Sequence, residues 1–514
     1  MGARQMAGSA ATLWDLLAWR AQVTPERPMY LDDLDQAVTY GEFLLRCERL
    51  AAGFGRLGIT LDTHVTWQMP TRFDSILVMM ALARIGACQN PVIPLYREKE
   101  VRSVVAQTTP EWLIVPRRWR DFDHEGLANR LAGEVTGLSV LVVDDGLPYG
   151  DPSTLPPPPP VSTTARWIYT TSGTTAEPKC VLHTDTSLLA AGRAMTTALQ
   201  LGSDDVGCLP VPIAHPGGFS YLVAMFTHGF PTVLVDPWSI DRAVGLMNRF
   251  GTTVMGGSTA HFIMLLGEQR KDPSTPLIDS VRMFTGGGAA LPAELFRQIV
   301  DGLGVRPAYG YGMTECPTIA MGSPSDTDEQ LANTPGRISD GLDVRVVDSQ
   351  QQLLDVGLEG EIEIRGPMVC LGYTDAELTA AAFTDDGWMR TGDRGYIRPD
   401  RHVVLTGRTK EIIIRKGENI SPAEIESVML KVPGVAAVSV IGLPDRDRGE
   451  MVCAVVELVA DAVPPTLIEV RRVCEHEGLM IQKVPERLEI VDHLPRSATM
   501  KVLKHELRDR FAPH

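Results

Sequence analysis

The sequence predicts an α/β protein with largely parallel sheets, followed by a small α+β unit. Three observations indicate this: a length of 514 residues, an alternation of strand-like and helix-like segments through most of the chain, and a change of texture after Gly336. About 150 residues per domain would give roughly three folding units. Alternating strands and helices imply parallel sheets with helices on both faces.

The first 140 residues carry clear local signals. Thr12 can cap a helix that has Asp15 in its first turn. Residues 40–57 are typical of an amphipathic helix, and the apolar run LSVLVV at 138–143 is typical of a buried strand. Five consecutive prolines at 156–160 then indicate a polyproline linker or surface loop, because they exclude a central helix or strand.

The remaining elements are short strands separated by helices or turns. We expect strands at 232–235, 252–255 and 281–284, with helices between them. After Gly336 we expect strands at 344–347, 360–365 and 403–405, and a junction at 407–416. The last hundred residues predict helices at 422–430 and 467–476 and strands at 436–441 and 452–458.

Composition excludes several classes of function. The 48 Lys and Arg residues against 64 Asp and Glu give a net charge of −16, which argues against a nucleic-acid or anionic-membrane partner. The longest apolar run, 76–83, is far shorter than the ~20 residues of a membrane span, and no signal peptide is visible. The eight cysteines are scattered without a CxxC pair, so we expect a cytoplasmic protein.

A loop rich in hydroxyl groups follows the strand-like residues 167–169. Its sequence, YTTSGTTAEPK at 169–179, holds five Ser and Thr hydroxyls, a glycine and Lys179. Many N–H and O–H donors beside a cation suit phosphate oxygens. The loop lacks the GxxxxGK[ST] pattern of a Walker A motif, and taken alone it fits a Ser/Thr-rich turn equally well.

Two further motifs combine glycines with acidic residues. In YGYGMTE at 309–315, Tyr311 can stack on a base and Glu315 is an oxygen ligand suited to Mg²⁺ beside phosphates. In TGD at 391–393, Asp393 can accept both hydroxyls of a ribose, and TGRTK follows at 406–410. Each motif taken alone is more simply a turn beside a strand.

Two lysine-containing segments complete the set. KGENISPAEIE at 416–426 taken alone is a loop that opens a helix at Pro422. PRSATMK at 495–501 ends in Lys501, and a single lysine is more often a solvated surface charge than a catalyst.

Together, in this order and spacing, the five segments resemble the motifs of the adenylate-forming (AMP-binding) superfamily, in its acyl/aryl-CoA synthetase branch. The resemblance covers nearly the whole chain, from about Leu13 to Leu507. It implies a large N-terminal domain, 1–408, of two packed α/β subdomains plus a β-barrel-like subdomain. A small mobile α+β C-terminal domain, 409–514, would be hinged at Lys410, with the active site between the two domains.

The resemblance also implies a reaction in two halves. A carboxylate attacks the α-phosphorus of ATP to give acyl-AMP and pyrophosphate, and a thiol, usually that of CoA, then displaces AMP. Because the first half brings an anion against a polyanion, the protein must neutralise charge and hold the atoms in line. We therefore expect an AMP-forming acid–thiol ligase that uses ATP and Mg²⁺, with CoA as co-substrate.

The site residues are carried over motif by motif. Lys501, Thr314, Glu315 and His215 are the expected catalytic residues, with Glu315 holding Mg²⁺ and Lys501 bridging the acid and the α-phosphate. Lys416 and Gly417 would line the thiol channel once the C-terminal domain has rotated about Lys410. The residues expected to bind ATP or AMP are Thr171, Ser172, Gly173, Thr174, Thr175, Lys179, Gly287, Gly288, Tyr311, Gly312, Thr314, Asp393 and Arg408.

The acyl pocket is assigned in the same way. Its expected lining residues are His215, Gly218, Phe219, Gly257, Ser258, Gly286, Tyr309 and Met313. Many are small, and Phe219 and Tyr309 can pack on a ring, so we expect an aromatic, alicyclic or medium-chain acid. An α-amino acid is disfavoured, because His215 and Pro216 stand where amino-acid-activating members carry Phe and Asp, and its ammonium would be buried unpaired.

The chain departs from the family pattern at several positions. Ala176 and Cys180 replace glycines of the phosphate loop, and Met500 replaces the glycine before Lys501. Val484 and Glu486 stand where a basic cluster that docks CoA phosphates often lies. The loss of this basic cluster weakens the inference of CoA more than that of ATP.

Two other functions therefore stay open at this point. One is an adenylating enzyme with a different acceptor, such as a carrier-protein thiol, an amine, or nitrite in N–N bond formation. The other is a catalytically silent homologue. Four retained residues argue against it: Glu315, Asp393, Arg408 and Lys501. The resemblance also leaves a homodimer open.

Overall fold

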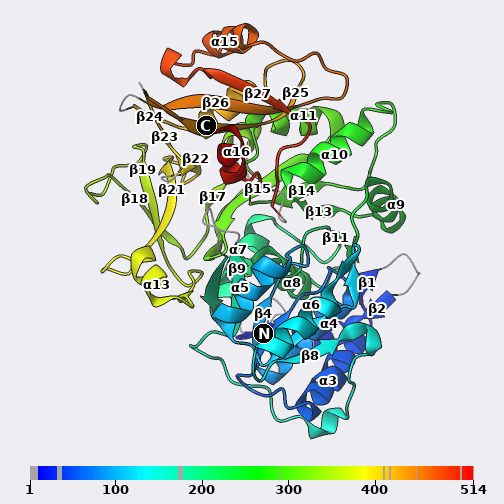
Figure 1. The fold of residues 1–514 in the computed structure, drawn as a ribbon. Helices are drawn as coiled ribbons and strands as arrows, with labels where there is room; N and C mark the ends of the chain where they lie inside the picture. Colours follow the sequence, from blue (N-terminus) through cyan, green and yellow to red (C-terminus); the bar gives the residue numbers. More distant parts are fainter. Residues whose placement is uncertain are drawn as a thin grey trace.

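The computed structural model describes residues 10–31, 37–171, 178–288, 290–408, 411–415, 418–446, 448–497 and 501–512. Over these residues two large sheets with flanking helices precede a four-stranded antiparallel sheet and a separate C-terminal sheet (Figure 1). The predicted mixed α/β class, with a large N-terminal part and a small C-terminal part, is confirmed.

The first large sheet has the strand order β20-β10-β9-β4-β3-β5-β8. Strands from β9 to β8 are parallel, whereas β10 runs antiparallel to β9. The strands are β3 His64–Trp67, β4 Cys88–Pro91, β5 Trp112–Val115, β8 Ser139–Val142, β9 Trp167–Thr171, β10 Lys179–His183 and β20 Gly372–Tyr373, and a small ribbon is formed by β6 Arg118–Trp119 and β7 Phe122–Asp123. The helices of this part are α2 Leu13–Val23, α3 Tyr40–Arg56, α4 Phe73–Ile85, α5 Glu98–Thr108 and α6 His124–Glu134, with 3₁₀ turns η1 Val143–Asp145 and η2 Pro152–Thr154.

The second large sheet has the order β17-β16-β15-β14-β13-β11-β12-β1-β2. Its central strands are parallel, so their carboxyl ends lie at one edge. The strands are β1 Pro28–Leu31, β2 Ala37–Thr39, β11 Gly207–Leu209, β12 Thr232–Leu234, β13 Val254–Gly257, β14 Met283–Gly286, β15 Arg306–Met313, β16 Cys316–Met321 and β17 Arg337–Ile338. The helices are α7 Asp185–Ala198, α8 Pro216–His228, α9 Ile240–Phe250, α10 Thr259–Gln269, α11 Ala293–Leu303 and α12 Asp328–Asn333.

The chain after β17 forms two smaller sheets. The subdomain expected to be barrel-like is the antiparallel sheet β18-β19-β21-β22, with α13 beside it. The C-terminal sheet, β24-β23-β26-β25 with β27 parallel to β26, lies at the opposite end of the molecule from the first 140 residues (Figure 1). The elements are β18 Asp343–Val347, β19 Gly360–Arg365, α13 Ala376–Ala382, β21 Met389–Ile397, β22 Val403–Arg408, β23 Ile413–Arg415, β24 Glu418–Ile420, α14 Pro422–Met429, β25 Val435–Asp445, β26 Gly449–Leu458, α15 Leu467–His476, η3 Ile481–Lys483, β27 Arg487–Val491 and α16 Lys504–Phe511.

Local signals located most of these elements. The Thr12 side chain accepts a hydrogen bond from the backbone of Asp15, and the carboxylate of Asp15 accepts one in return, as the sequence predicts. The expected buried strand at 138–143 is β8, but it is half-buried, because it lies at the sheet edge with β5 as its one neighbour. The strands expected at 252–255 and 281–284 each begin two residues later, at Val254 and Met283.

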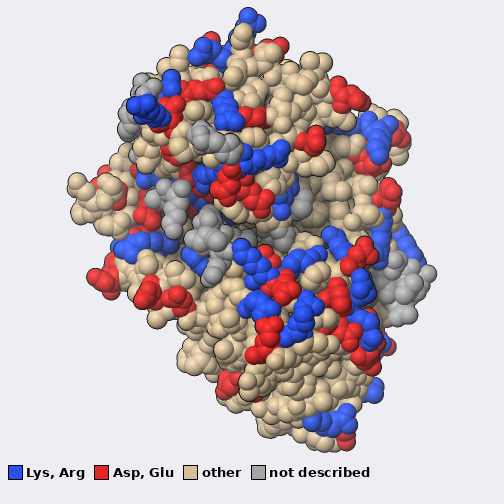
Figure 2. Space-filling model, viewed as in Figure 1, with Lys and Arg blue, Asp and Glu red and all other residues tan. Residues whose placement is uncertain are grey.

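Helices α7 and α8 lie against β16 of one large sheet, and the ring of Phe219 in α8 packs edge-on against Trp167 in β9 of the other, 4.9 Å between centroids. This core joins the two sheets and fixes the position of the loops at their edges. On the face drawn in Figure 2, basic and acidic side chains are interspersed, so this face has no continuous basic surface of the kind that nucleic acids bind. No helix in the described part of the chain is long and apolar enough to cross a membrane.

Candidate active site

A cavity of about 640 Å³ lies where both large sheets, the four-stranded sheet and the C-terminal segment meet. Motif residues from β9, β10, the start of α8 and the ends of β13, β14 and β15 line it, together with Arg408 and Lys501. Residues separated by hundreds of positions therefore share one solvent-accessible space.

Asp393 organises one side of the cavity. Its Oδ2 accepts a hydrogen bond of 2.7 Å from the hydroxyl of Tyr311, and its Oδ1 accepts one of 2.8 Å from Nε of Arg408. Asp393 is 4% exposed and does not itself line the cavity, whereas its two partners do. Burial alone would lower the pKa of Arg408, but the carboxylates of Asp393 and Glu411 raise it, so the guanidinium stays charged.

Glu315 and Lys179 lie on either side of Tyr373. The Tyr373 hydroxyl donates a 2.6 Å hydrogen bond to Oε1 of Glu315, and Nζ of Lys179 lies 5.5 Å from the centroid of the Tyr373 ring. Burial, and then the charge of Glu315, raise the pKa of Tyr373, so its phenol stays protonated and donates. An acidic and a basic group thus contact the same tyrosine beside the start of β10.

The backbone of Thr314 is held in place by a histidine side chain, His183. Nε2 of His183 lies 2.8 Å from the backbone oxygen of Thr314, and Nδ1 lies 2.9 Å from Oγ of Ser187. Burial lowers the pKa of His183 to about 4, so it is neutral at pH 7 and its one N–H can donate to the Thr314 carbonyl. His183 is a positioning residue that sequence analysis missed.

His215 caps the first turn of α8. Its Nδ1 accepts a 3.1 Å hydrogen bond from the backbone N–H of Gly217, and its ring lines the cavity. Burial, and then repulsion from Lys501, lower the pKa of His215 to about 4. Because a neutral imidazole carries one proton, acceptance at Nδ1 leaves the N–H on Nε2, where it can donate.

Lys501 reaches the cavity from the C-terminal segment. Loss of solvation among the surrounding protein atoms, followed by repulsion from Arg408, lowers the pKa of Lys501, while nearby carboxylates oppose the change. Three residues further on, Nζ of Lys504 lies 3.3 Å from Glu411 and 2.9 Å from Glu426. These ion pairs tie α16 to the segment that follows β22 and to α14.

Two glycines allow backbone segments to approach closely at the cavity wall. A Cβ at Gly286 would lie 1.9 Å from the carbonyl oxygen of Gly257, and one at Gly312 would lie 2.2 Å from that of Pro317. Neither neighbour is a flexible side-chain end, so a larger residue would displace the strands β13–β16. The glycines of the motifs therefore shape the wall, in addition to exposing backbone to a ligand.

The structure does not place three of the expected acyl-pocket residues at the cavity surface. Phe219 is 0% exposed and packs into the core between the sheets, because α8 turns this face toward Trp167. Gly218 lies against the backbone of Ile213, and Tyr309 is buried behind the wall, where its hydroxyl donates to the carbonyl of Gly287 at 3.1 Å. Five expected positions do line the cavity: His215, Gly257, Ser258, Gly286 and Met313.

Several predicted residues lie outside the described residues. These are Ser172, Gly173, Thr174, Thr175 and Ala176 of the phosphate loop, Lys410, Lys416, Gly417 and Met500. Thr171 and Lys179, at the two ends of the phosphate loop, line the cavity, as do Gly287, Gly288 and Gly312. Cys180 is fully buried and burial raises the pKa of its thiol to about 12, which is consistent with a small core residue rather than a nucleophile.

Sequence analysis also missed a large apolar part of the cavity wall. Tyr373 and Glu411 belong to none of the motifs that we singled out, and the apolar residues have types found throughout any core. The missed apolar lining residues include Met195, Leu199, Leu201, Leu209, Tyr221, Phe230 and Val254.

Comparison with known proteins gives consistent matches along the chain. Residues 17–374 match the family model for the AMP-binding enzyme, and residues 424–501 match that for the AMP-binding enzyme C-terminal domain. The medium-chain fatty-acid–CoA ligase of Escherichia coli K12 is 29% identical over 97% of this chain and 90% of its own length. The 2-hydroxy-7-methoxy-5-methyl-1-naphthoate–CoA ligase of Streptomyces carzinostaticus is 31% identical over 96% of this chain and 92% of its own length.

Among solved structures, ATP-bound MatB from Rhodopseudomonas palustris is similar with a TM-score of 0.88 and 24% identity, over 97% of this chain and 99% of that chain. This likeness shows the fold. Further relatives at 28% identity are named as AMP ligases rather than CoA ligases.

Proposed function

The chain belongs to the AMP-binding enzyme family, and from that premise we propose that it activates a carboxylic acid with ATP and transfers the acyl group to CoA. The observation that carries the proposal is one cavity with two unlike ends: a charged end lined by Lys179, Arg408 and Lys501, and an apolar end lined by residues such as Leu209 and Tyr221. A polyanion and the apolar body of an acid need such a division.

The charged end suits ATP. Lys179, Arg408 and Lys501 supply positive charge around the site, and Thr171 adds a hydroxyl at the start of the phosphate loop. Tyr311 is held by Asp393 in a position to stack on a base, and Arg408 can donate to a ribose or a phosphate from its remaining N–H groups. Lys501 then neutralises the acid and the α-phosphate where they meet.

Glu315 fits Mg²⁺, because this ion is commonly bound by one or two carboxylates together with substrate phosphates. The Tyr373 hydroxyl holds one carboxylate oxygen of Glu315 and so orients the group. Bound there, Mg²⁺ would neutralise phosphate charge. Neutral His215 can donate from Nε2 to the acyl carboxylate or carbonyl without adding charge.

The substrate is an aromatic, alicyclic or medium-chain acid. The apolar residues of the cavity support this class, and the two relatives described above are named for a medium-chain fatty acid and a bicyclic aromatic acid. An α-amino acid is disfavoured, because none of the described lining residues on α7, α8, β11 or β13 is a carboxylate that could pair with an ammonium.

We place the domain boundary at 408/409, with Lys410 as the hinge and Lys416 and Gly417 in the thiol channel. The sheet topology supports a division here, since strands up to β22 and strands from β23 onward belong to different sheets. The eight cysteines are all free, which suits the cytoplasm that we propose as its location.

An acceptor other than CoA is the second candidate, and one observation favours it. Glu486, at a position where relatives often carry basic residues, accepts a 2.6 Å hydrogen bond from Arg415 and lies 3.1 Å from Nε of Arg448. Burial would raise the pKa of Glu486, but these arginines lower it, so it stays charged. Two cations that could meet CoA phosphates are thereby partly neutralised.

The test is pyrophosphate release from Mg-ATP across a panel of carboxylic acids, each measured with and without CoA. We expect release with apolar acids, and faster turnover with thioester formation when CoA is present. Acid-dependent release that is indifferent to CoA would favour the second candidate. No release with any acid would contradict the proposed adenylation.

A further inference from the structure

The apolar end of the cavity extends deep beside the second large sheet. Val254 lies three residues before Gly257 on β13, and at about 3.3 Å per residue this places it roughly 10 Å deeper than the glycine wall. The charged residues that line the cavity lie on other elements: Lys179, Glu315, Glu361, Arg390, Arg408, Glu411 and Lys501. None of the described lining residues on α7, α8, β11 or β13 is charged at pH 7.

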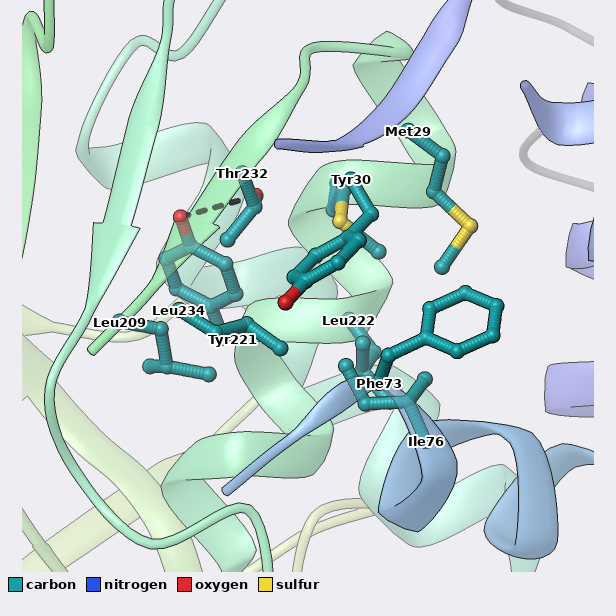
Figure 3. Close-up of a pocket in the computed structure, with 10 residues that line it drawn as sticks. Met29, Tyr30, Phe73, Ile76, Leu209, Tyr221, Leu222, Thr232 and Leu234 are labelled. Atoms are coloured by element: carbon teal, nitrogen blue, oxygen red, sulfur yellow. Dashed lines mark hydrogen bonds between the residues drawn. The ribbon is translucent and has the colours of Figure 1, made fainter. Parts of the chain in front are cut away.

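A second, much smaller apolar hollow lies beyond this end. It has a volume of about 10 Å³ and lies between β1, α4 and α8, where Met29, Tyr30 and Phe73 form its outer side (Figure 3). Leu209 and Tyr221 line both the hollow and the large cavity. These two side chains are therefore the wall between the two spaces.

Tyr221 is the fixed part of this wall. Its hydroxyl shares a 3.1 Å hydrogen bond with Thr232 Oγ1, drawn as the dashed line in Figure 3, and its ring packs edge-on against Phe230 at 6.1 Å. A Cβ at Gly207 would lie 1.8 Å from the Tyr221 hydroxyl oxygen, so this glycine makes room for the phenol. Thr232, Phe230 and Gly207 therefore surround the Tyr221 side chain and leave it little freedom to change rotamer.

We propose that Tyr221 is the specificity-determining residue that sets the maximum length of the acid, and that the acid carries an uncharged, apolar tail ending against this ring. The inference rests on the proposed function of the cavity. A second ionised group at the tail end would lie among apolar side chains with no charged lining residue near it, which is unfavourable. Removing the ring would join the cavity to the hollow.

The experiment compares kcat/KM for pyrophosphate release over a series of straight-chain and ω-phenyl acids of increasing length. A methylene that gains or loses its place in an apolar pocket changes kcat/KM by roughly tenfold or more. We therefore expect Tyr221→Ala to raise the ratio of a longer acid to the parent's best acid by at least about tenfold. We call the dependence of kcat/KM on acid length the length profile. Tyr221→Phe, which keeps the ring, should leave this length profile unchanged.

Phe73→Ala is the matched control, because Phe73 lines the hollow but not the large cavity. It enlarges the hollow while leaving the wall in place, so the length profile should not move. If Tyr221→Ala keeps the parent profile, or if Phe73→Ala shifts it equally, the proposal is overturned. Should Tyr221→Ala fail to fold, Leu209→Ala opens the other half of the same wall and carries the same expectation.

A second readout separates this inference from the proposed function. The rise in Tm that each acid of the series causes reports binding without chemistry. If the parent releases no pyrophosphate with any acid, the proposed function fails, and the Tm measurements alone test the inference. A larger rise in Tm with longer acids in Tyr221→Ala than in the parent supports Tyr221 as the residue that limits acid length. The same dependence of Tm on acid length in both proteins overturns it.

Discussion

The two ends of the cavity are built on opposite principles. At the charged end, hydrogen bonds between different strands hold several of the groups, as Asp393 holds Tyr311 and Arg408. At the apolar end, close packing sets the shape of the cavity. The hydrogen bond that Tyr221 makes with Thr232 holds the ring in place and does not serve a ligand. Function at one end thus depends on charge and orientation, and at the other on volume.

The difference predicts how each end responds to substitution. Removing a partner at the charged end leaves a buried charge or donor unpaired, which is costly. Removing atoms at the apolar end changes which substrates fit while the chemistry continues.

The largest effect is expected for Lys501→Ala at the charged end. Removal of one preorganised charge costs about 10²-fold or more, so acid-dependent pyrophosphate release should fall at least that far. Transfer from a pre-made acyl-AMP to CoA should be spared, because Lys501 acts on the first half. Stopped-flow measurement of both half-reactions checks this, and equal loss in both would refute the assignment.

A smaller effect is expected for Glu315→Gln. The amide keeps the size of the side chain but loses the negative charge that suits Mg²⁺, so the Mg²⁺ concentration for half-maximal rate should rise about tenfold. Glu361→Gln, at another carboxylate of the cavity wall, is the control and should leave the requirement unchanged. An unaltered Mg²⁺ dependence in the first variant argues against its role as a ligand.

A more modest effect is expected on the dependence of the adenylation rate on pH. The pKa of Lys501 is lowered, so its ammonium deprotonates at a lower pH than that of an ordinary lysine, and the adenylation rate should fall correspondingly early as pH rises. Glu411 is one of the carboxylates that oppose this shift, so Glu411→Gln should move the alkaline limb to still lower pH. Rates measured from pH 7 to 11 test the direction; a limb that moves upward contradicts it.

Phe219→Ala should have the smallest effect on catalysis. Deleting a buried phenylalanine costs about 3–5 kcal/mol of stability, but the side chain does not line the cavity, so the acid profile should match that of the parent. Urea unfolding and the acid panel together check this. A changed preference for acid length would indicate that Phe219 contacts the acid. It would also weaken the distinction between the charged and the apolar end of the cavity.

The same division explains what could be predicted from the sequence. Lys179, Tyr311, Glu315 and Arg408 were predicted as site residues because their motifs resemble those of the adenylate-forming superfamily in order and spacing, and all four line the cavity. Helix α15 was located to the residue, since its apolar positions recur at helical spacing and Thr466 caps it.

The apolar wall could not be predicted, because leucine, methionine and phenylalanine serve a core and a pocket equally well. Phe219 and Tyr221 are two positions apart on α8, yet one faces the core and the other the cavity, and their types carry no signal that separates them. Helix α16 was missed for a related reason: most of its residues are polar, and Leu507 and Phe511 alone are buried.

The most direct test of the account is the identity of the nucleotide product formed from Mg-ATP and an apolar carboxylic acid without CoA, measured by mass spectrometry of the quenched reaction. We expect an acyl-AMP with release of pyrophosphate, formed at least about 10²-fold more slowly by Lys501→Ala. Acid-dependent formation of ADP and phosphate would contradict it, because the acid would then have attacked the γ-phosphorus.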